Sequence, residues 1–199
     1  MMNFPRAWFL AALTLAAAVS RIVPHPYNFA PFATVALFGA ATFPGRWSAV
    51  IVPFASLLLG DALLQITYLA GWQPNWGFYR GQWVVYASLA PMILMGFAIR
   101  RRRNFATVAA ATLAGSVSFF LTTNFAVWAG GSHETYPATV QGLLLCYEAA
   151  IPFFRNTVAG DVCYATALFG GLAMAEARFP SLRLVDRPRT PALVEVHPG

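Results

Sequence analysis

The sequence predicts an all-α integral membrane protein, folded as a six-transmembrane-helix bundle. Of the 199 residues, 58% are hydrophobic and only 10% are charged, which excludes a disordered chain and an ordinary water-soluble domain. Six apolar stretches approach the length of about 20 residues that a helix needs to cross a bilayer. No segment alternates polar and apolar residues over about ten positions, as the strands of a membrane β-barrel do.

The first two predicted helices are short and form a hairpin. They cover residues 7–22 and 29–43, with a proline-rich turn between them. The start of the chain also resembles a secretory signal, because Arg6 precedes an apolar core that is followed by Ala16-Ala17-Ala18. Removal of this helix would leave five crossings and put one arginine-rich end on the wrong side of the membrane. We therefore expect the first helix to belong to the bundle.

The other four predicted helices cover residues 48–70, 83–99, 105–129 and 147–176. The helices at 48–70 and 105–129 are long and carry almost no charge. The helix at 83–99 ends against four consecutive arginines, and the last helix has Pro152 in its first turns. Residues 1–177 thus form one membrane domain. Residues 178–199 are rich in proline and arginine without apolar periodicity, which predicts a flexible cytoplasmic tail.

The basic residues give the orientation of the predicted bundle. All 13 are arginines, and 10 of them fall on one side of the membrane if the N-terminus is inside. Such a bias is typical of cytoplasmic loops, so we expect both termini in the cytoplasm. The arginines lie in short clusters between apolar runs, and this pattern does not indicate a nucleic-acid partner. Of the three remaining arginines, Arg21 is assigned to the outer membrane interface.

Polar and aromatic side chains are concentrated in the outer loops at 21–28, 71–82 and 130–146. An aromatic belt that only anchors helix ends should be more symmetrical than this, although anchoring remains an alternative for each single ring. For Asn124 the alternative is a hydrogen bond between helices. We predict a substrate pocket beneath the three loops, lined by His25, Asn28, Trp72, Trp76, Tyr79, Arg80, Asn124, Trp128, Glu148 and Arg155.

Two carboxyl groups, Asp61 and Asp161, are predicted to lie within the membrane. Counted along their helices at about 1.5 Å per residue, they lie roughly 14 Å and 21 Å below the outer surface. An ionised carboxylate at such depth costs about 2.5–3.5 kcal/mol on insertion scales unless it is paired. Both aspartates are therefore expected to have partners. For Glu148 and Arg155, the alternative to binding a ligand is a structural ion-pair network that includes Asp61 or Asp161.

The order of these features resembles the substrate-binding S components of energy-coupling-factor vitamin transporters. The resemblance covers residues 7–177 and rests on the short Ala-rich first helix, the segment from Arg21 to Asn28 with Pro31, and the runs Pro44-Gly45-Arg46-Trp47 and Leu59-Gly60-Asp61. The run at 24–31, the run at 123–128 and Pro152-Phe153-Phe154 also look like an uncharacterised family of six-helix bacterial membrane proteins of similar layout. The resemblance to S components implies a bundle in the bacterial inner membrane that captures a vitamin or similar micronutrient beneath loops one, three and five.

The same resemblance implies a partner. S components dock on a transmembrane coupling protein through small residues on the first helix, and Ala12 and Ala16 have that spacing here. The chain has no lysine and so cannot form a phosphate-binding loop of the Gly-x-x-x-x-Gly-Lys type. ATP energy would have to come from ATPase subunits of the partner. The resemblance implies neither a cofactor nor enzymatic activity.

Three other classes are weighed against substrate capture. A structural or assembly protein without a ligand is the main alternative. An intramembrane aspartyl hydrolase would use Asp61 and Asp161 as a dyad, but neither residue lies in the Gly-x-Gly-Asp pattern of such proteases. A metal site would use His25, His133, Glu134, Glu148 or Cys146, and no pair of these has ligand spacing, so no metal is expected.

Overall fold

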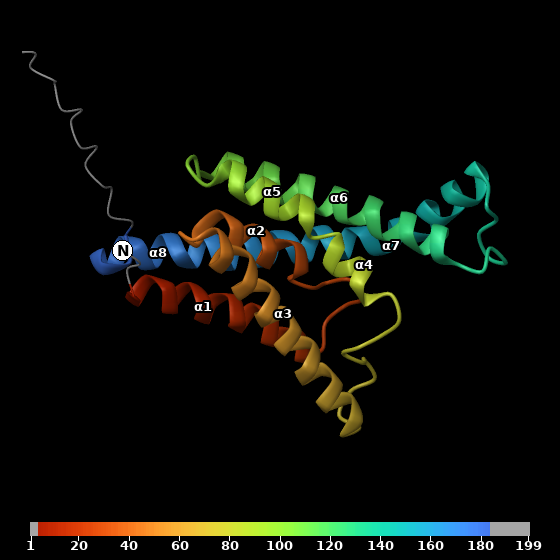
Figure 1. Cartoon of the computed structure of the whole chain (residues 1–199), viewed down its shortest axis with the longest axis horizontal. Helices are drawn as coiled ribbons and strands as arrows, with labels where there is room; N and C mark the ends of the chain where they lie inside the picture. Colours follow the sequence, from red (N-terminus) through yellow and green to blue (C-terminus); the bar gives the residue numbers. More distant parts are fainter. Residues whose placement is uncertain (1–3, 184–199) are drawn as a thin grey trace, which may run out of the picture.

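The structure is a computed structural model that describes residues 4–183 (Figure 1). The described chain is all α-helical apart from turns and loops. The helices are α1 (Phe4–Val19), α2 (Phe32–Thr42), α3 (Arg46–Leu69), α4 (Gln82–Ala87), α5 (Ala90–Ile99), α6 (Phe105–Gly130), α7 (Val140–Ala165) and α8 (Gly171–Arg178). A π-helical turn, Thr166–Gly170, joins α7 to α8. Most of the predicted tail at 178–199 lies outside the described residues.

Four helical segments are long and apolar enough to cross a membrane: Arg46–Leu69, Gln82–Ile99, Phe105–Gly130 and Val140–Arg178. The prediction of an all-α, multi-pass membrane protein is therefore confirmed at this level. The segment Gln82–Ile99 comprises α4 and α5, and Val140–Arg178 comprises α7, the π-helical turn and α8. α2 is apolar but too short to span, since its 11 residues rise only about 16 Å.

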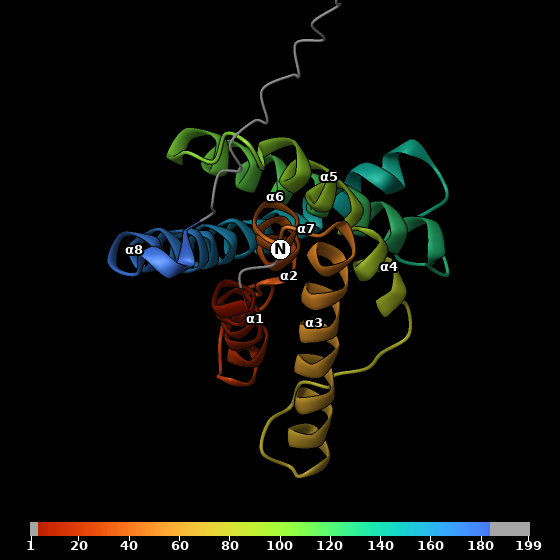
Figure 2. The ribbon, with the colours of Figure 1, turned by 60° about the vertical axis from the view of Figure 1, so that its left-hand side comes forward.

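α2 is the centre of the bundle. Every residue from 33 to 42 is buried, and α2 packs against α1, α3, α5, α6 and α7. Figure 2 shows it near the middle of the view with these helices around it. α2 lacks charged residues and is apolar on all faces, which suits a helix enclosed by protein on every side. The other helices thus hold a short helix that could not cross the bilayer alone.

Close approach of α2 to its neighbours depends on glycine. A Cβ added at Gly96 of α5 would lie 2.6 Å from the Leu37 carbonyl oxygen of α2, and one at Gly39 would lie 2.1 Å from the Pro53 ring of α3. Small residues at such points let helix backbones pack closely in membranes, where dispersion and hydrogen bonding replace the hydrophobic effect. The pairings of α2 with α3 and α5 therefore require these two glycines.

The two ends of the bundle differ in chemistry. Figure 1 shows the start of α1, the α2–α3 and α5–α6 connections and the end of α8 at one end of the molecule, which we call the arginine-rich end. There Arg6 forms an ion pair with Glu176, and Arg100 donates two hydrogen bonds, of 3.0 and 2.8 Å, to the Ala40 carbonyl near the end of α2. The loops before α2, before α4 and between α6 and α7 lie at the opposite end.

Among the differences from the predicted boundaries, three concern the later helices and α2. The last helix starts at Val140 rather than 147, because Thr139 caps it by accepting a hydrogen bond from the Gly142 backbone and the residues that follow are largely apolar. α2 starts at Phe32 rather than 29, directly after Pro31. The predicted helix at 83–99 is broken near Ser88, since Pro91 lies in the first turn of α5 and lacks the amide that would continue α4.

α1 packs into the bundle. Leu10, Ala17 and Ala18 of α1 belong to the hydrophobic core, and α1 packs along α3. The Ala18 carbonyl would lie 2.8 Å from a Cβ added at Gly60 of α3. This contact places the end of α1, and with it Arg21, directly beside the middle of α3.

Replacement of Gly96 should test the close packing of α2 on α5. Gly96→Leu forces a side chain against the backbone of α2, and overpacking of this kind typically costs about 1–3 kcal/mol. We expect a lower midpoint of thermal unfolding in detergent. Gly130→Leu is the matched control, because a Cβ at Gly130 meets nothing within 4 Å. Equal midpoints for the two variants would contradict the proposed packing.

Candidate functional site

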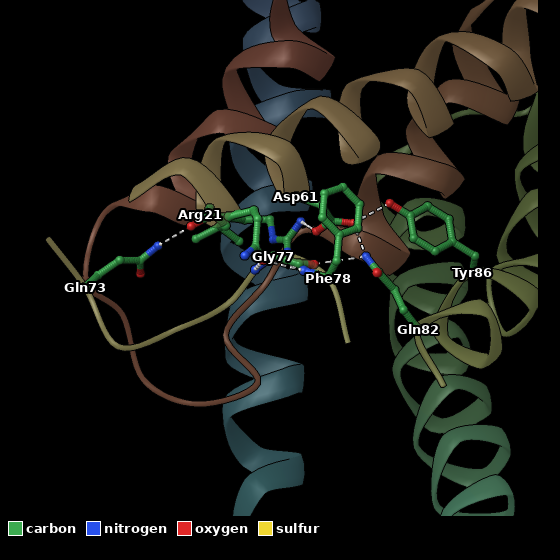
Figure 3. Close-up of polar contacts among 9 residues, drawn as sticks. Arg21, Asp61, Gln73, Gly77, Phe78, Gln82 and Tyr86 are labelled. Atoms are coloured by element: carbon green, nitrogen blue, oxygen red, sulfur yellow. Dashed lines mark hydrogen bonds and ion pairs between the residues drawn. The ribbon is translucent and has the colours of Figure 1, made fainter. Parts of the chain in front are cut away.

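Asp61 is the centre of a buried polar cluster near the loops opposite the arginine-rich end. Its carboxylate forms an ion pair with Arg21 and accepts hydrogen bonds from the Gln82 amide and from the Tyr86 hydroxyl, the latter at 2.5 Å. Figure 3 shows these side chains converging on Asp61 from the turn after α1 and from α4. We call Arg21, Asp61, Gln82 and Tyr86 the Asp61 cluster.

The position of Arg21 corrects its assignment to the membrane interface. Its exposed fraction is 9%, and that of Asp61 is 0%. The guanidinium also lies 4.1 Å from the centre of the Phe32 ring at the start of α2, a cation–π contact that partly replaces water. Ionisable residues inside a membrane domain normally face the protein interior and pair with one another, as these two do.

The loop at 70–81 is fastened over this cluster, and we call it the lid loop. The Gln65 side chain of α3 accepts hydrogen bonds of 3.2 Å from the backbone amides of Gly77 and Phe78. Gln73 donates to the Thr67 hydroxyl at 2.7 Å, and Gln82 donates to the Gly77 carbonyl at 3.2 Å. Figure 3 shows Gly77 and Phe78 next to the Arg21–Asp61 pair.

Gly77 allows this contact. A Cβ added there would lie 1.8 Å from the Asp61 carbonyl oxygen, so only glycine lets the lid loop lie on α3 at this point. The phenol of Tyr79, on the same loop, has its pKa raised above the ordinary value by burial and then by the charge of Asp61. The lid loop is therefore close enough to the Asp61 carboxylate for its charge to change the pKa of Tyr79.

The predicted aromatic residues of the lid loop point largely outward. Trp72, Trp76 and Tyr79 are 80%, 60% and 45% exposed, and Arg80 is exposed as well. Trp76 packs on Tyr68 of α3, with ring centres 5.8 Å apart. Neither of the two hollows described below is lined by any of these residues.

Asn124 and Trp128 of α6 make their hydrogen bonds within the α6–α7 hairpin. The Asn124 amide donates to the Phe120 carbonyl one turn earlier at 2.8 Å, and the Trp128 indole donates to the Pro137 carbonyl at 2.9 Å. No hydrogen bond or ring contact links either residue to the lid loop within residues 4–183. The structure thus separates the two halves of the predicted pocket.

The other predicted contacts are dispersed. His25 lies 6.4 Å from the Phe29 ring, and Asn28 is exposed with a positive φ of 63° in a turn. Glu148 and Arg155 are exposed on α7, and neither forms an ion pair in the described part of the chain. The ion-pair network suggested for these two residues with Asp61 or Asp161 is therefore not formed.

Asp161 has a different environment from Asp61. It is buried on α7, where its carboxyl oxygens accept hydrogen bonds from Thr34 of α2 at 2.8 Å and from Ser116 of α6 at 2.7 Å. Both partners are hydroxyl groups, without a guanidinium. The two aspartates share no hydrogen-bond partner, so the dyad that the hydrolase alternative needs is not formed.

Two hollows between the helices lie away from the predicted site, because no predicted substrate-binding residue lines either of them. The larger is a groove of about 530 Å³ near the arginine-rich end, between α6 and α7–α8. The smaller is a packing gap beside Asp161 without room for a water molecule, lined in part by Thr34, Met92 and Thr112. No group of three His, Cys, Asp or Glu side chains that could hold a metal ion occurs among residues 4–183. Neither hollow corresponds to the predicted pocket beneath the three loops.

Sequence reasoning missed several partners of the two aspartates, namely Thr34, Gln82, Tyr86 and Ser116, and it missed Gln65, which holds the lid loop. For two of these residues, the spacing in the sequence indicates a neighbour on the same helix face. Gln65 is one turn after Asp61, and Tyr86 is one turn after Gln82, so each pair shares a helix face. Which faces meet depends on helix packing, which this spacing does not specify.

Residues 2–182 match a family model described as a family of unknown function, DUF6580. No curated protein and no solved structure matches the chain.

Removal of either charge from the Arg21–Asp61 pair should destabilise the fold strongly. Arg21→Gln or Asp61→Asn leaves the other charge buried without its partner, which typically costs about 3–5 kcal/mol of unfolding free energy. The double variant Arg21→Met/Asp61→Leu should recover part of this loss. The measurement is unfolding in detergent, with the exposed Arg80→Gln as control, expected within about 0.5 kcal/mol of the parent. Single variants as stable as Arg80→Gln would refute the role of the pair.

The same substitution should be mild at the second aspartate. Asp161→Asn keeps a carbonyl acceptor, and the hydroxyls of Thr34 and Ser116 can donate or accept, so we expect a loss near 1 kcal/mol. Asp161→Leu leaves both hydroxyls without this partner and should cost about 1–3 kcal/mol for each one that stays unsatisfied. Unfolding in detergent measures both. A loss for Asp161→Asn as large as that for Asp61→Asn would mean that Asp161 has a charged partner.

Proposed function

The chain belongs to the DUF6580 family, of unknown function, and from this premise we propose that it is a membrane-embedded substrate-capture subunit for a vitamin or similar small micronutrient. In this proposal the protein is a six-helix bundle of the S-component type in the bacterial inner membrane, with both termini in the cytoplasm. The substrate enters from the outer side, and its site lies beneath loops one, three and five of the chain.

The observation that carries the proposal is the Arg21–Asp61 pair buried beneath the lid loop. Ionisable groups within a membrane domain are expensive to bury and often serve a function. Arg21 supplies a fork of N–H donors suited to a carboxylate or phosphate, and Asp61 supplies acceptors for hydroxyl or amino groups. Together they would recognise a small polar molecule that bears groups of both kinds.

The lid loop provides a means of access. It is attached to α3 and α4 by hydrogen bonds that Gln65 accepts and that Gln73 and Gln82 donate. Each such bond contributes only about 0.5–1.5 kcal/mol net, because water replaces it when the loop lifts. Binding energy of a ligand can offset this cost. The exposed rings of Trp72, Trp76 and Tyr79 are then available to stack on a ligand as the loop closes again.

The other predicted walls are on α6. Figure 1 shows the outer end of α3 and the α6–α7 turn diverging, with the first loop and α4 between them. In the proposed mechanism, the substrate lies between the end of α3 and the α6–α7 turn, where Asn124 and Trp128 contact it. The remaining substrate-binding residues in this proposal are polar and belong to the same outer region: His25, Asn28, Arg80, Glu148 and Arg155.

Release into the cell requires an energised partner. Ala12 and Ala16 are both exposed on α1, which suits close packing against a helix of a transmembrane coupling protein. ATPase subunits attached to that protein would supply the energy.

A structural or assembly role is the second candidate. It is favoured by the complete internal pairing of Asp61, which leaves this carboxylate no need for a ligand. A protein of this class would use its exposed helix faces to hold partner subunits. It would show no response to small molecules, and this difference separates the two candidates.

Ligand binding should appear as thermal stabilisation of the purified protein. A panel of vitamins and related micronutrients is added to the protein in detergent, and the unfolding midpoint is recorded. A ligand at 100 times its Kd stabilises the folded state by about 2.7 kcal/mol. Asn124→Ala and Trp128→Ala should reduce the shift without loss of folded protein. No shift with any compound would favour the structural role.

Loosening the lid loop should change the binding rates of the compound that this panel identifies. Gln65→Ala removes both hydrogen bonds to the Gly77 and Phe78 amides, so the lid loop should open more readily and the ligand should dissociate faster. Gln141→Ala, at an exposed position of α7, is the matched control and should leave the rate unchanged. Surface-immobilised protein gives the dissociation rate. Equal rates in Gln65→Ala and the parent would show that this loop does not cover the ligand.

A further inference from the structure

An open groove lies at the arginine-rich end, far from the Asp61 cluster. It has a volume of about 530 Å³ and lies between the first half of α6 and the segment from the end of α7 to α8. Its walls are mainly apolar, with Val108, Leu113, Val162 and Phe169 among them. Arg103, Asn104 and Glu176 are the polar groups at one end. The groove is thus apolar over most of its length and polar at one end.

Helix geometry accounts for this groove. The π-helical turn at Thr166–Gly170 interrupts the α-helix opposite α6, and π-turns often mark functional sites. A Cβ added at Gly170 meets nothing within 4 Å, so α6 does not fill this space. Ala109 and Ala173 also line the groove and leave room by their small size. Phe105 at its rim is 90% exposed, which is expected of a surface that faces lipid.

Arg103 is the uncompensated charge of this groove. Its side chain is partly buried, yet it makes no hydrogen bond or ion pair within residues 4–183. Burial lowers the pKa of its guanidinium from the ordinary value. Glu176 stabilises the charge from a distance, but it is ion-paired with Arg6. The Asn104 carboxamide is also occupied, because it caps α6 by accepting a hydrogen bond of 2.9 Å from Thr107.

We propose that this groove binds an anionic phospholipid of the membrane leaflet at the arginine-rich end, with its phosphate on Arg103 and an acyl chain between α6 and α7–α8. A guanidinium binds phosphate with two parallel hydrogen bonds, which would satisfy donors that the protein leaves unpaired. Basic pockets between membrane helices on the cytoplasmic side are typical sites for acidic lipid head groups. Arg101 and Arg102, both exposed in the same turn, add to the attraction.

A phospholipid fits better than a free anion. The long apolar walls offer nothing to inorganic phosphate, whereas they match an acyl chain, and burial of each methylene contributes about 0.8 kcal/mol. The lipid would also pack against the π-helical turn, so it would link α6 to α8 at the level of the head groups. This site is independent of substrate capture, since the Asp61 cluster and the lid loop lie at the other end of the bundle.

Lipid binding is tested with the full chain in detergent, by native mass spectrometry and by thermal unfolding on titration with phosphatidylglycerol or phosphatidylcholine. Phosphatidylglycerol should be retained and should raise the unfolding midpoint more than phosphatidylcholine does. Arg103→Gln should weaken its binding about tenfold, as expected for loss of a charge-assisted hydrogen-bonding partner. The adjacent exposed Arg102→Gln is the matched control and should change it less than about twofold.

Two further arms make the outcome decisive. Ala173→Trp fills the groove and should abolish retention of phosphatidylglycerol while Arg103 remains; Ala109→Leu serves if the larger substitution prevents folding. Glycerol 3-phosphate, which has the head-group charge without acyl chains, should neither stabilise the protein nor compete. Equal binding of both lipids, parent-like binding by Arg103→Gln, or equal competition by glycerol 3-phosphate would each overturn the proposal.

Discussion

The buried ion pair between Arg21 and Asp61 holds together the end of the molecule opposite the arginine-rich end. In lipid no water can compensate an unpaired charge, so each of these groups depends on the other and on protein donors. Gln82 and Tyr86 complete the carboxylate's hydrogen bonds and thereby fix α4 against α3. The turn after α1, the middle of α3, the lid loop and α4 are therefore positioned by one carboxylate.

The need of buried polar groups for protein partners also accounts for contacts around α2. Asp161 obtains its hydrogen bonds from Thr34 on α2 and Ser116 on α6, which links three helices at a single point. Arg100 supplies donors to the Ala40 carbonyl near the end of α2. A central helix of only 11 residues is thus connected to its neighbours by polar groups near both its ends, while glycines let the backbones approach between them.

The two ends of the molecule suit different partners. The lid-loop end combines a buried charge pair with exposed aromatic rings on a loop held by a few hydrogen bonds, and there we propose the site for a small polar molecule. The arginine-rich end has an open apolar groove and the guanidinium of Arg103, which forms no ion pair with any residue from 4 to 183; both features suit a lipid. α6 and α7 run the length of the bundle and contribute to both regions, so the substrate and lipid sites that we propose would share the same two helices.

The sequence by itself determined the all-α membrane class, the long spans and the arginine-rich end, because hydropathy and charge act locally and need no knowledge of packing. It also located Asp61 and Asp161 as buried carboxyl groups. Only the tertiary structure decided their partners. Arg21 and Asp61 are 40 positions apart, and Thr34 and Asp161 are 127 apart, so their pairing follows from which helix faces meet. Asn124 and Trp128 were predicted to reach a ligand, yet nearer carbonyls at Phe120 and Pro137 accept their hydrogen bonds. Spacing along one helix identifies a shared face, but it does not say what that face will touch.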